Sequence, residues 1–316
     1  MRGAALFLLS ALAIAQDRTI SSDADVRRVA FSKDGKTLAG ACEDRKLRLW
    51  DASSGSLRKA IAWDKDEAAV GYNPASGLIA IAGKDGNLVL SEVESRREVR
   101  RIAVGERRLT RAVMADDGQL FAGSTRVPGN SRDHVMRLWD VAGKERFTVA
   151  SGTGGMLAGA ISPDGSILAA GGWDTNVRVW NTRNGELVRL IDDDLLVSMF
   201  DMAFSPDGRH LAAAGVDRTV YFWDTKTWKL ERKFTGQPEM ISTLAFSPDG
   251  RLLATGGFND ITEKHPVSIL LWDVATGKVL RTLPAPKMVT GVAFSPDGNL
   301  LAAATSEKTV RLWTVR

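Results

Sequence analysis

The stretch from Met202 to Asp224 reads MAFSPDGRHLAAAGVDRTVYFWD, and it decides the fold. Its first short strand ends at Phe204 and is followed by Ser-Pro-Asp-Gly, which is typical of a tight turn. In such a turn proline presets φ, the aspartate side chain bonds nearby backbone, and glycine accepts a positive φ. A strand of small residues follows at 211–215, and after a second turn comes a strand that ends in Phe-Trp-Asp. The stretch therefore predicts short antiparallel strands joined by tight turns.

The same pattern recurs along the whole chain. The phrase FSPDG stands at 204–208, 246–250 and 294–298, and looser copies stand at 31–35, 72–77, 114–118 and 161–165. A second phrase, most often Leu-Trp-Asp, follows each copy. Its tryptophan position falls at 50, 91, 139, 180, 223, 272 and 313, and Ser91 replaces the tryptophan in the second copy. Seven copies in phase indicate a repeat architecture.

These two phrases resemble the WD40 family, whose repeat forms one four-stranded propeller blade. The resemblance covers residues 18–316 and implies an all-β fold, a seven-bladed β-propeller of four-stranded blades. The seventh copy reaches Arg316 directly after its third strand. In this family the leading peptide commonly supplies the missing strand, so we expect Arg18–Ile20 to close the ring. Residues 16–316 would then form a single domain.

The chain departs from the family in one respect. The family often carries a Gly-His pair whose histidine joins a serine or threonine, an aspartate and the tryptophan in a hydrogen-bonded set, and this chain has no Gly-His. An aspartate six residues before the tryptophan position is kept at Asp44, Asp85, Asp133, Asp174 and Asp217. We therefore expect the full network to be missing and each indole N–H to find another partner or water.

The first fifteen residues predict a signal peptide of bacterial type. Met1-Arg2 precedes an apolar run from Gly3 to Ala15, and the exit fits cleavage after Ala15 or after Ala13. The run is short for a membrane span, which needs about 20 residues. We expect an exported protein, periplasmic or secreted, with no membrane span after cleavage; an uncleaved anchor or a buried first helix is the alternative. Cys42, the only cysteine, is expected to be an inert buried thiol.

Composition and motifs argue against catalysis and against nucleic acid as a partner. The formal net charge is only +4, and like charges do not gather in long blocks. The three histidines show no metal-binding spacing, and the serines show no nucleophile elbow. We expect no enzyme activity, no metal and no cofactor.

Candidate binding residues come from the resemblance, which places certain positions on the upper rim of the ring. Exposed aromatic, methionine and arginine side chains are enriched in protein interfaces. The expected partner-binding residues are Lys84, Arg108, Arg132, Trp173, Met240, Phe258 and Met288.

Two lengthened connections, at 124–133 and 258–266, would stand on the same rim and bring His134 and His265 there. They are interpreted as partner-gripping loops, as neutral variation or as a clamp for a metal or another ligand.

The sequence thus predicts a monomeric, non-enzymatic scaffold that binds an unidentified protein. The alternative is a propeller enzyme, or a sensor of a small ligand or metal, with its site at the channel mouth. The aspartates at strand-leading positions, Asp25 and Asp66, are the residues that favour this alternative.

Overall fold

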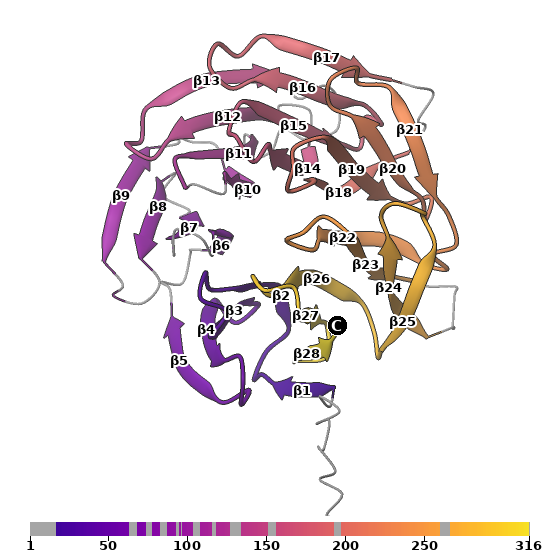
Figure 1. The fold of residues 1–316 in the computed structure, drawn as a ribbon. Helices are drawn as coiled ribbons and strands as arrows, with labels where there is room; N and C mark the ends of the chain where they lie inside the picture. Colours follow the sequence, from indigo (N-terminus) through magenta and orange to yellow (C-terminus); the bar gives the residue numbers. More distant parts are fainter. Residues whose placement is uncertain are drawn as a thin grey trace, which may run out of the picture.

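The computed structural model describes residues 17–62, 68–73, 78–82, 87–92, 95, 97–103, 108–115, 118–126, 134–150, 156–192, 197–259 and 266–315. Within these residues the strands form seven four-stranded antiparallel sheets that follow one another around a ring (Figure 1). This is the arrangement of a seven-bladed propeller, and it agrees with the all-β fold that the repeat predicts.

Each of the first three sheets is built from consecutive strands. Blade one contains β2 (Val26–Phe31), β3 (Thr37–Cys42), β4 (Lys46–Asp51) and β5 (Leu57–Ala62). Blade two contains β6 (Ala68–Asn73), β7 (Leu78–Ala82), β8 (Asn87–Glu92) and β9 (Glu98–Ala103). Blade three contains β10 (Arg108–Met114), β11 (Leu120–Arg126), β12 (His134–Asp140) and β13 (Glu145–Ala150).

The next three sheets repeat this order, and the seventh does not. Blade four contains β14 (Met156–Ile161), β15 (Ile167–Gly172), β16 (Val177–Asn181) and β17 (Leu187–Ile191). Blade five contains β18 (Met199–Phe204), β19 (His210–Gly215), β20 (Val220–Asp224) and β21 (Leu230–Phe234). Blade six contains β22 (Met240–Phe246), β23 (Leu252–Phe258), β24 (Val267–Asp273) and β25 (Val279–Ala285). Blade seven contains β26 (Val289–Phe294), β27 (Leu300–Thr305), β28 (Thr309–Thr314) and β1 (Arg18–Ser21).

The Ser-Pro-Asp-Gly turns form the contacts that the sequence predicts. The Ser205 hydroxyl donates to Asp207 Oδ1 at 2.6 Å and accepts the His210 N–H at 3.0 Å, while Gly208 has a φ of 70°. A Cβ built on Gly208 would lie 3.8 Å from Pro163 Cδ in the turn of blade four. The turns of neighbouring blades therefore pack on one another, and this fixes the spacing between blades.

The core lies between the sheets. Trp50, Trp139, Trp223, Trp272 and Trp313 are almost fully buried, and they pack on the small residues of the second strands. Buried residues of adjacent blades share one cluster, as in the group that joins blades four and five. Stability therefore comes from packing of each blade on the next.

Cys42 lies in the packing between blades one and seven. It is a buried free thiol, and burial raises its pKa, which disfavours the reactive thiolate.

The N-terminal strand β1 occupies the outer position of the seventh sheet. It pairs antiparallel with β28, so that Ile20 is the register partner of Val310. The Ile20 side chain is 4% exposed and joins the cluster that contains residues of blades one and seven. Blades seven and one are also in direct contact, because the Lys308 N–H donates to Asp25 Oδ1 at 3.0 Å.

The predicted signal peptide, 1–15, lies outside the described residues. Among the residues that are described, no helix has the length and apolarity to cross a membrane.

Candidate functional site

Each sheet has two different ends. One end carries the turns between first and second strands and between third and fourth strands. The other end, here called the top surface, carries the turns between second and third strands and the connections between blades. Trp173 lies in the turn between β15 and β16, Met240 begins β22, Phe258 ends β23, and Met288 directly precedes β26. These four predicted residues therefore share the top surface.

The structure joins two of them through a third aromatic residue. The Trp173 ring lies 5.8 Å from the Phe200 ring, edge to face at 80°, and the Phe200 ring lies 5.9 Å from the Phe258 ring. We call Trp173, Phe200 and Phe258 the aromatic row; it spans blades four, five and six. Trp173 is 54% exposed and contacts the next blade rather than folding onto its own.

The sequence analysis did not single out Phe200. Its position in the sheet explains why its ring contacts the neighbouring blades. It lies at the irregularity in the β18–β19 register, between Met199 and Asp201. In blade six the equivalent bulge residue is Ser242, whose hydroxyl donates to the carbonyl of Val289 in blade seven at 2.6 Å. A phenylalanine cannot make this bond, so its ring is left to contact the aromatic side chains of the adjacent blades. An edge-to-face pair contributes about 1 kcal/mol beyond burial, which favours the observed arrangement of the Trp173 and Phe200 rings.

The two methionines extend the top surface to blades six and seven. Met240 is half-buried and is the register partner of Phe258. Met288 is 37% exposed, and its carbonyl accepts the Ser306 N–H at 3.1 Å. Apolar side chains thus occur on the top surface of four successive blades.

Other predicted residues lie where the structure does not describe them. Lys84, Arg132, Asp66 and His265 are outside the described residues. Arg108 and His134 begin β10 and β12, but their side chains are not described. The lengthened connections are described only at 124–126 and at 258–259 with 266. Their interpretation as loops that grip a partner stays a prediction.

A buried carboxylate lies directly beside the row. Asp201 Oδ2 accepts the Leu244 N–H of blade six at 3.1 Å and lies 3.8 Å from the Arg28 guanidinium of blade one. Blades one and five are not neighbours in the ring, so this ion pair reaches across it (Figure 1). Because Arg28 is half exposed, the pair adds little energy. The Asp201 carboxylate ties β18 of blade five to β22 of blade six.

Blade six retains part of the family's hydrogen-bonded network. Trp272 Nε1 donates to Thr255 Oγ1 at 2.8 Å, and Thr255 Oγ1 donates to Gln237 Oε1 at 2.7 Å. Gln237 follows Gly236, so a glutamine stands where the family has histidine. A side-chain amide can accept the same bond as an imidazole, so the indole N–H of Trp272 keeps its threonine partner here. The full set is still missing, as expected, because Pro266 stands in the aspartate position.

Blade six also lacks the aspartate that stands six residues before the tryptophan in other blades. The position six residues before Trp272 is Pro266, whereas Asp44 and Asp174 pair with arginines four residues later in their blades. In this blade the fully buried Glu239 supplies the carboxylate instead. It accepts hydrogen bonds from the Ser268 N–H and from the Ser268 hydroxyl, the latter at 2.9 Å. Glu239 and Gln237 anchor the segment that leads into Met240.

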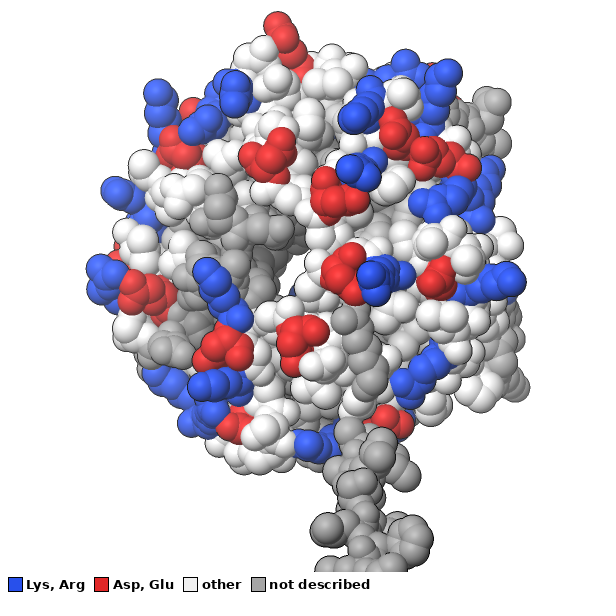
Figure 2. Space-filling view, viewed as in Figure 1, with Lys and Arg blue, Asp and Glu red and all other residues white. Residues whose placement is uncertain are grey.

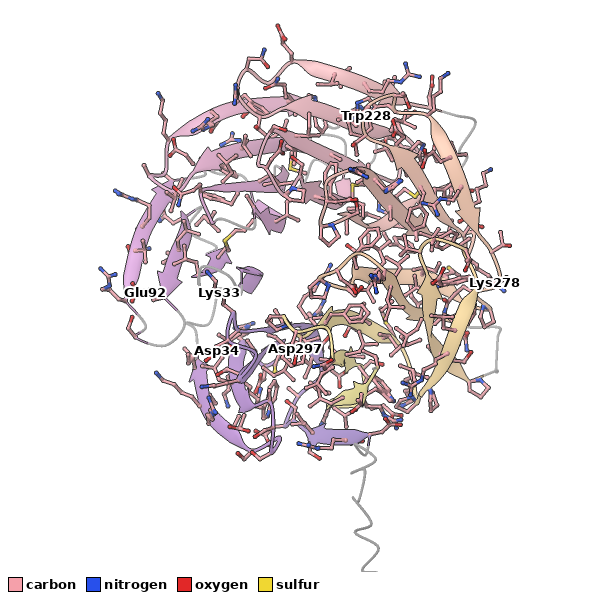
Figure 3. The ribbon with its side chains drawn as sticks, in the orientation of Figure 1. Lys33, Asp34, Glu92, Trp228, Lys278 and Asp297 are labelled. Atoms are coloured by element: carbon pink, nitrogen blue, oxygen red, sulfur yellow. The ribbon has the colours of Figure 1, made fainter. Side chains whose placement is uncertain are left out.

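The opposite face has a different chemical character. Its turns place Lys33, Asp34 and Asp297 near the centre of the ring and Glu92, Trp228 and Lys278 further out (Figure 3). Figure 2 shows acidic and basic side chains interspersed around the central hollow. No single sign dominates this view, as the small net charge leads one to expect.

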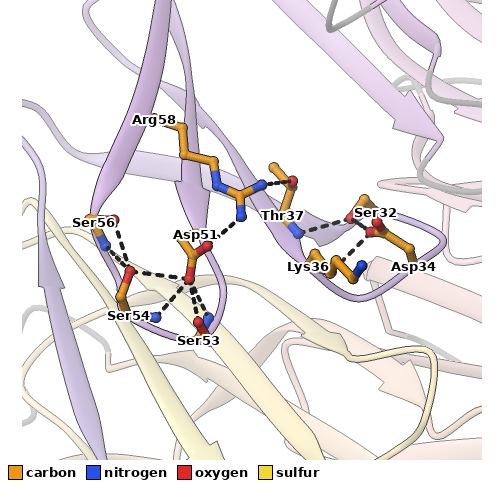
Figure 4. A network of polar contacts seen from close by, with 9 residues as sticks. All are labelled: Ser32, Asp34, Lys36, Thr37, Asp51, Ser53, Ser54, Ser56 and Arg58. Atoms are coloured by element: carbon orange, nitrogen blue, oxygen red, sulfur yellow. Dashed lines mark hydrogen bonds and ion pairs between the residues drawn. The ribbon is translucent and has the colours of Figure 1, made fainter.

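A cleft of about 690 Å³ lies on that face between blades one and seven. Asp34 accepts the Ser32 hydroxyl at 2.6 Å and the Lys36 N–H at 3.0 Å (Figure 4). Asp51 accepts the Ser53 hydroxyl and a guanidinium bond from Arg58. These bonds, with Ser32 and Ser53 foremost, hold the pKa of both carboxyls below its usual range.

The carboxylates in this cleft are therefore ionised acceptors that cap turns, rather than proton donors at neutral pH. Among the described residues, no group of three or more histidine, cysteine, aspartate or glutamate side chains could hold a metal ion.

Comparison with known proteins identifies the family. The sequence model of the WD domain, G-beta repeat, matches residues 15–51, 147–181, 197–224, 228–261 and 277–314, which is more than half of the chain. The chain belongs to the WD40 family. The matches leave out 52–146, the region of the WD40 propeller that includes blade two, where Ser91 replaces the repeat's tryptophan.

Several curated proteins are similar over about half of the WD40 chain. Autophagy-related protein 16 of Arabidopsis thaliana is 25% identical over 162 residues, which cover 49% of this chain and 30% of that protein. Periodic tryptophan protein 2 homolog of Dictyostelium discoideum is 26% identical over 164 residues, covering 50% and 17%. The guanine nucleotide-binding protein subunit beta of Saccharomyces cerevisiae is 25% identical over 167 residues, covering 50% and 39%. The chain therefore spans less than half the length of each of these relatives.

Proposed function

We propose that this protein is an exported, non-enzymatic scaffold that docks a protein partner on the aromatic row of its top surface. WD40 proteins generally act as interaction scaffolds, and one relative is by name a subunit of a larger assembly. The observation that carries the proposal is the row itself: Trp173, Phe200 and Phe258 lie in ring contact across three blades, with Trp173 more than half exposed.

The row favours binding because the strands beneath it hold its side chains in fixed positions. Tryptophan and other large side chains carry most of the binding energy in protein interfaces when they enter a pocket on the partner. The row rests on strands tied by Asp201 in blade five and by Glu239 in blade six. A partner therefore docks without first having to order the side chains of this surface, which lowers the entropic cost of binding.

Two further parts of the proposal concern the N-terminus. The proposed ring is closed by β1, whose pairing with β28 supports this. The proposed export rests on Arg2 and the apolar run that follows it. The proposed destination is a periplasm or the outside of the cell.

The test is comparative capture of a partner. Tagged protein carrying Trp173→Ala and Phe200→Ala is crosslinked in an extract of the cells that make it, beside the wild type. The amount of partner captured by the double variant should be at least tenfold lower than the amount captured by the wild type. The reason is that truncating two aromatic side chains of an interface is expected to cost about 2 kcal/mol or more of binding free energy.

The matched control is Leu280→Ala, which removes a side chain that is 55% exposed on the outer strand β25. It should capture the partner as well as the wild type does. Equal capture by the double variant and the wild type would refute docking on the aromatic row.

A further inference from the structure

The outer strands of the blades carry a different charge from the rest of the chain. Each forms the exposed edge of its sheet, so β1, β5, β9, β13, β17, β21 and β25 together make up the circumference of the ring (Figure 1). They contain ten basic residues and three acidic ones, and this surplus of seven positive charges exceeds the +4 of the whole chain. The remainder of the chain is therefore net negative. The basic residues are Arg18, Arg58, Lys59, Arg100, Arg101, Arg146, Arg189, Arg232, Lys233 and Arg281, and the acidic residues are Glu98, Glu145 and Glu231.

The circumference also exposes apolar side chains. Among the residues whose exposure is described, large apolar side chains face solvent on the top surface, at Trp173 and Met288, and on three outer strands. Basic residues beside exposed apolar ones are typical of surfaces that bind an anionic membrane. The basic charge attracts the lipid headgroups, and the apolar side chains enter the layer beneath them. The exposed apolar residues of the outer strands are Leu57, Leu187, Val188, Leu190, Val279 and Leu280.

One arc of the circumference combines both features without acidic residues. It consists of three successive outer strands, β25 of blade six, β1 of blade seven and β5 of blade one, and we call it the basic arc. Strands β9, β13 and β21 contain Glu98, Glu145 and Glu231. Strand β17 has no acidic residue of its own, but it lies between β13 and β21 (Figure 1). An anionic surface is therefore attracted most strongly to the basic arc.

Two arginines of the basic arc are placed to meet an external anion. Arg18 and Arg281 are both exposed. The Arg281 guanidinium donates to the carbonyl oxygen of Thr314 at 2.6 Å, a neutral acceptor that does not cancel its charge. Arg58 differs from them, because it forms an ion pair with Asp51. Arg18 and Arg281 are therefore expected to contribute most of the attraction.

The charged and apolar residues of the basic arc lie at one level of the ring. Leu57 and Val279 are the register partners of the tryptophans in their blades. Arg18 is the register partner of Leu312, which directly precedes the tryptophan of blade seven. This level is close to the turns between third and fourth strands, on the face opposite the top surface. A single flat surface can therefore touch all of these residues while the aromatic row stays open.

The sequence ahead of β1 points to the same arc. The apolar run from Gly3 to Ala15 ends three residues before Arg18. Three residues of extended chain span about 10 Å at most. While this run is inserted in a membrane, as a signal peptide before cleavage or as an anchor, β1 is held close to the lipid headgroups. Charge and chain connectivity thus select the same part of the circumference.

We propose that the basic arc binds the surface of a membrane that contains anionic lipids. Arg18 and Arg281 lie against the headgroups, and Leu57 and Leu280 enter the layer beneath them. Because the charges involved are few, the association is peripheral and weakens as salt is added. The proposal does not depend on docking at the aromatic row, so either proposal can fail without the other.

Co-sedimentation with lipid vesicles tests the charged part of the proposal. The protein is the chain 16–316, which contains all seven described sheets but not the apolar run. It should bind vesicles of phosphatidylcholine mixed with phosphatidylglycerol but not vesicles of phosphatidylcholine alone, and added salt should release it. Arg18→Glu combined with Arg281→Glu should weaken binding by about thirtyfold or more, because each basic residue near an anionic surface contributes about 1 kcal/mol.

The matched control is Arg183→Glu combined with Arg189→Glu. It reverses two exposed arginines of blade four and changes the net charge by the same amount, so it should bind the vesicles as the wild type does. Equal loss of binding in the two double variants would show that net charge alone matters, and would overturn the proposal.

A second pair of variants tests the apolar part. Leu280 in the basic arc and Leu187 on β17 are matched, because their side chains are 55% and 54% exposed on outer strands. Leu280→Asp should weaken vesicle binding by about tenfold or more, whereas Leu187→Asp should leave it unchanged. Equal binding by these two variants would also overturn the proposal.

The wild type alone can contradict the account as well. Failure to bind the vesicles that contain phosphatidylglycerol, or equal binding to both kinds of vesicle, would overturn it. Binding of a DNA duplex without binding of the vesicles would make the basic arc a nucleic-acid site instead.

Discussion

Removal of residues 17–22 should lower the free energy of unfolding by about 4 kcal/mol or more. The deletion takes away β1, which exposes the edge of β28 and uncovers the apolar surface that Ile20 covers. Burial of one isoleucine side chain alone contributes about 2 to 3 kcal/mol. The measurement is urea denaturation of the mature chain with and without these residues.

Two point variants separate packing from chain length in this experiment. Ile20→Ala should account for about half of the loss, because its side chain is 4% exposed. Thr19→Ala, at an exposed position of the same strand, should have little effect. An unchanged unfolding midpoint after the deletion would show that β1 does not close the ring.

Gly257→Ala should destabilise the protein by about 3 kcal/mol. A Cβ at this position would lie 1.7 Å from the carbonyl oxygen of Met240 and 2.8 Å from its carbonyl carbon. Because backbone atoms cannot turn away as a side chain can, the ends of β22 and β23 must separate. Since Met240 and Phe258 lie there, loss of partner capture should accompany the loss of stability.

Gly159→Ala is the matched control for this substitution. Gly159 also lies in a strand, but its added Cβ would meet nothing closer than the Ala169 carbonyl oxygen at 3.6 Å, an ordinary contact. In thermal unfolding, the melting temperature of Gly159→Ala should be close to that of the wild type, and the melting temperature of Gly257→Ala should be far lower. Equal melting temperatures for the two variants would mean that the β22–β23 contact is not tight.

The repeat in the sequence predicted the fold because each phrase has a local physical cause. The proline and glycine of the first phrase, Pro206 and Gly208 in blade five, form a turn, and the tryptophan of the second phrase, Trp223, marks a buried strand. Neither the turn nor the strand depends on distant contacts. Even the pairing of β1 could be expected, because Ile20 stands in the register of an outer strand. Trp173 and Met288 are exposed in the structure, and their part in binding stays a prediction.

The residues that the sequence did not reveal depend on contacts between blades. Phe200 occupies a bulge position, and only the neighbouring Trp173 and Phe258 make it part of a surface. Gln237 could have been found from the Gly-Gln pair that replaces Gly-His, but its role depends on Thr255 lying opposite Trp272. Side chains that act across a blade boundary cannot be read from a repeat that describes one blade.

The edge strand shows the same limit in a different way. Leu187, Val188 and Leu190 look like ordinary strand residues in the sequence, where alternate apolar positions are expected to be buried. The structure shows that these three side chains face solvent on the outermost strand of blade four.

Site-specific photocrosslinking tests the central claim, docking on the top surface, most directly. A photoreactive amino acid is placed at Trp173 in one protein and at Arg209, an exposed residue of a turn on the opposite face, in another. Irradiation of the complex should attach the partner to position 173 and leave position 209 free. Attachment at 209 with none at 173 would contradict the account.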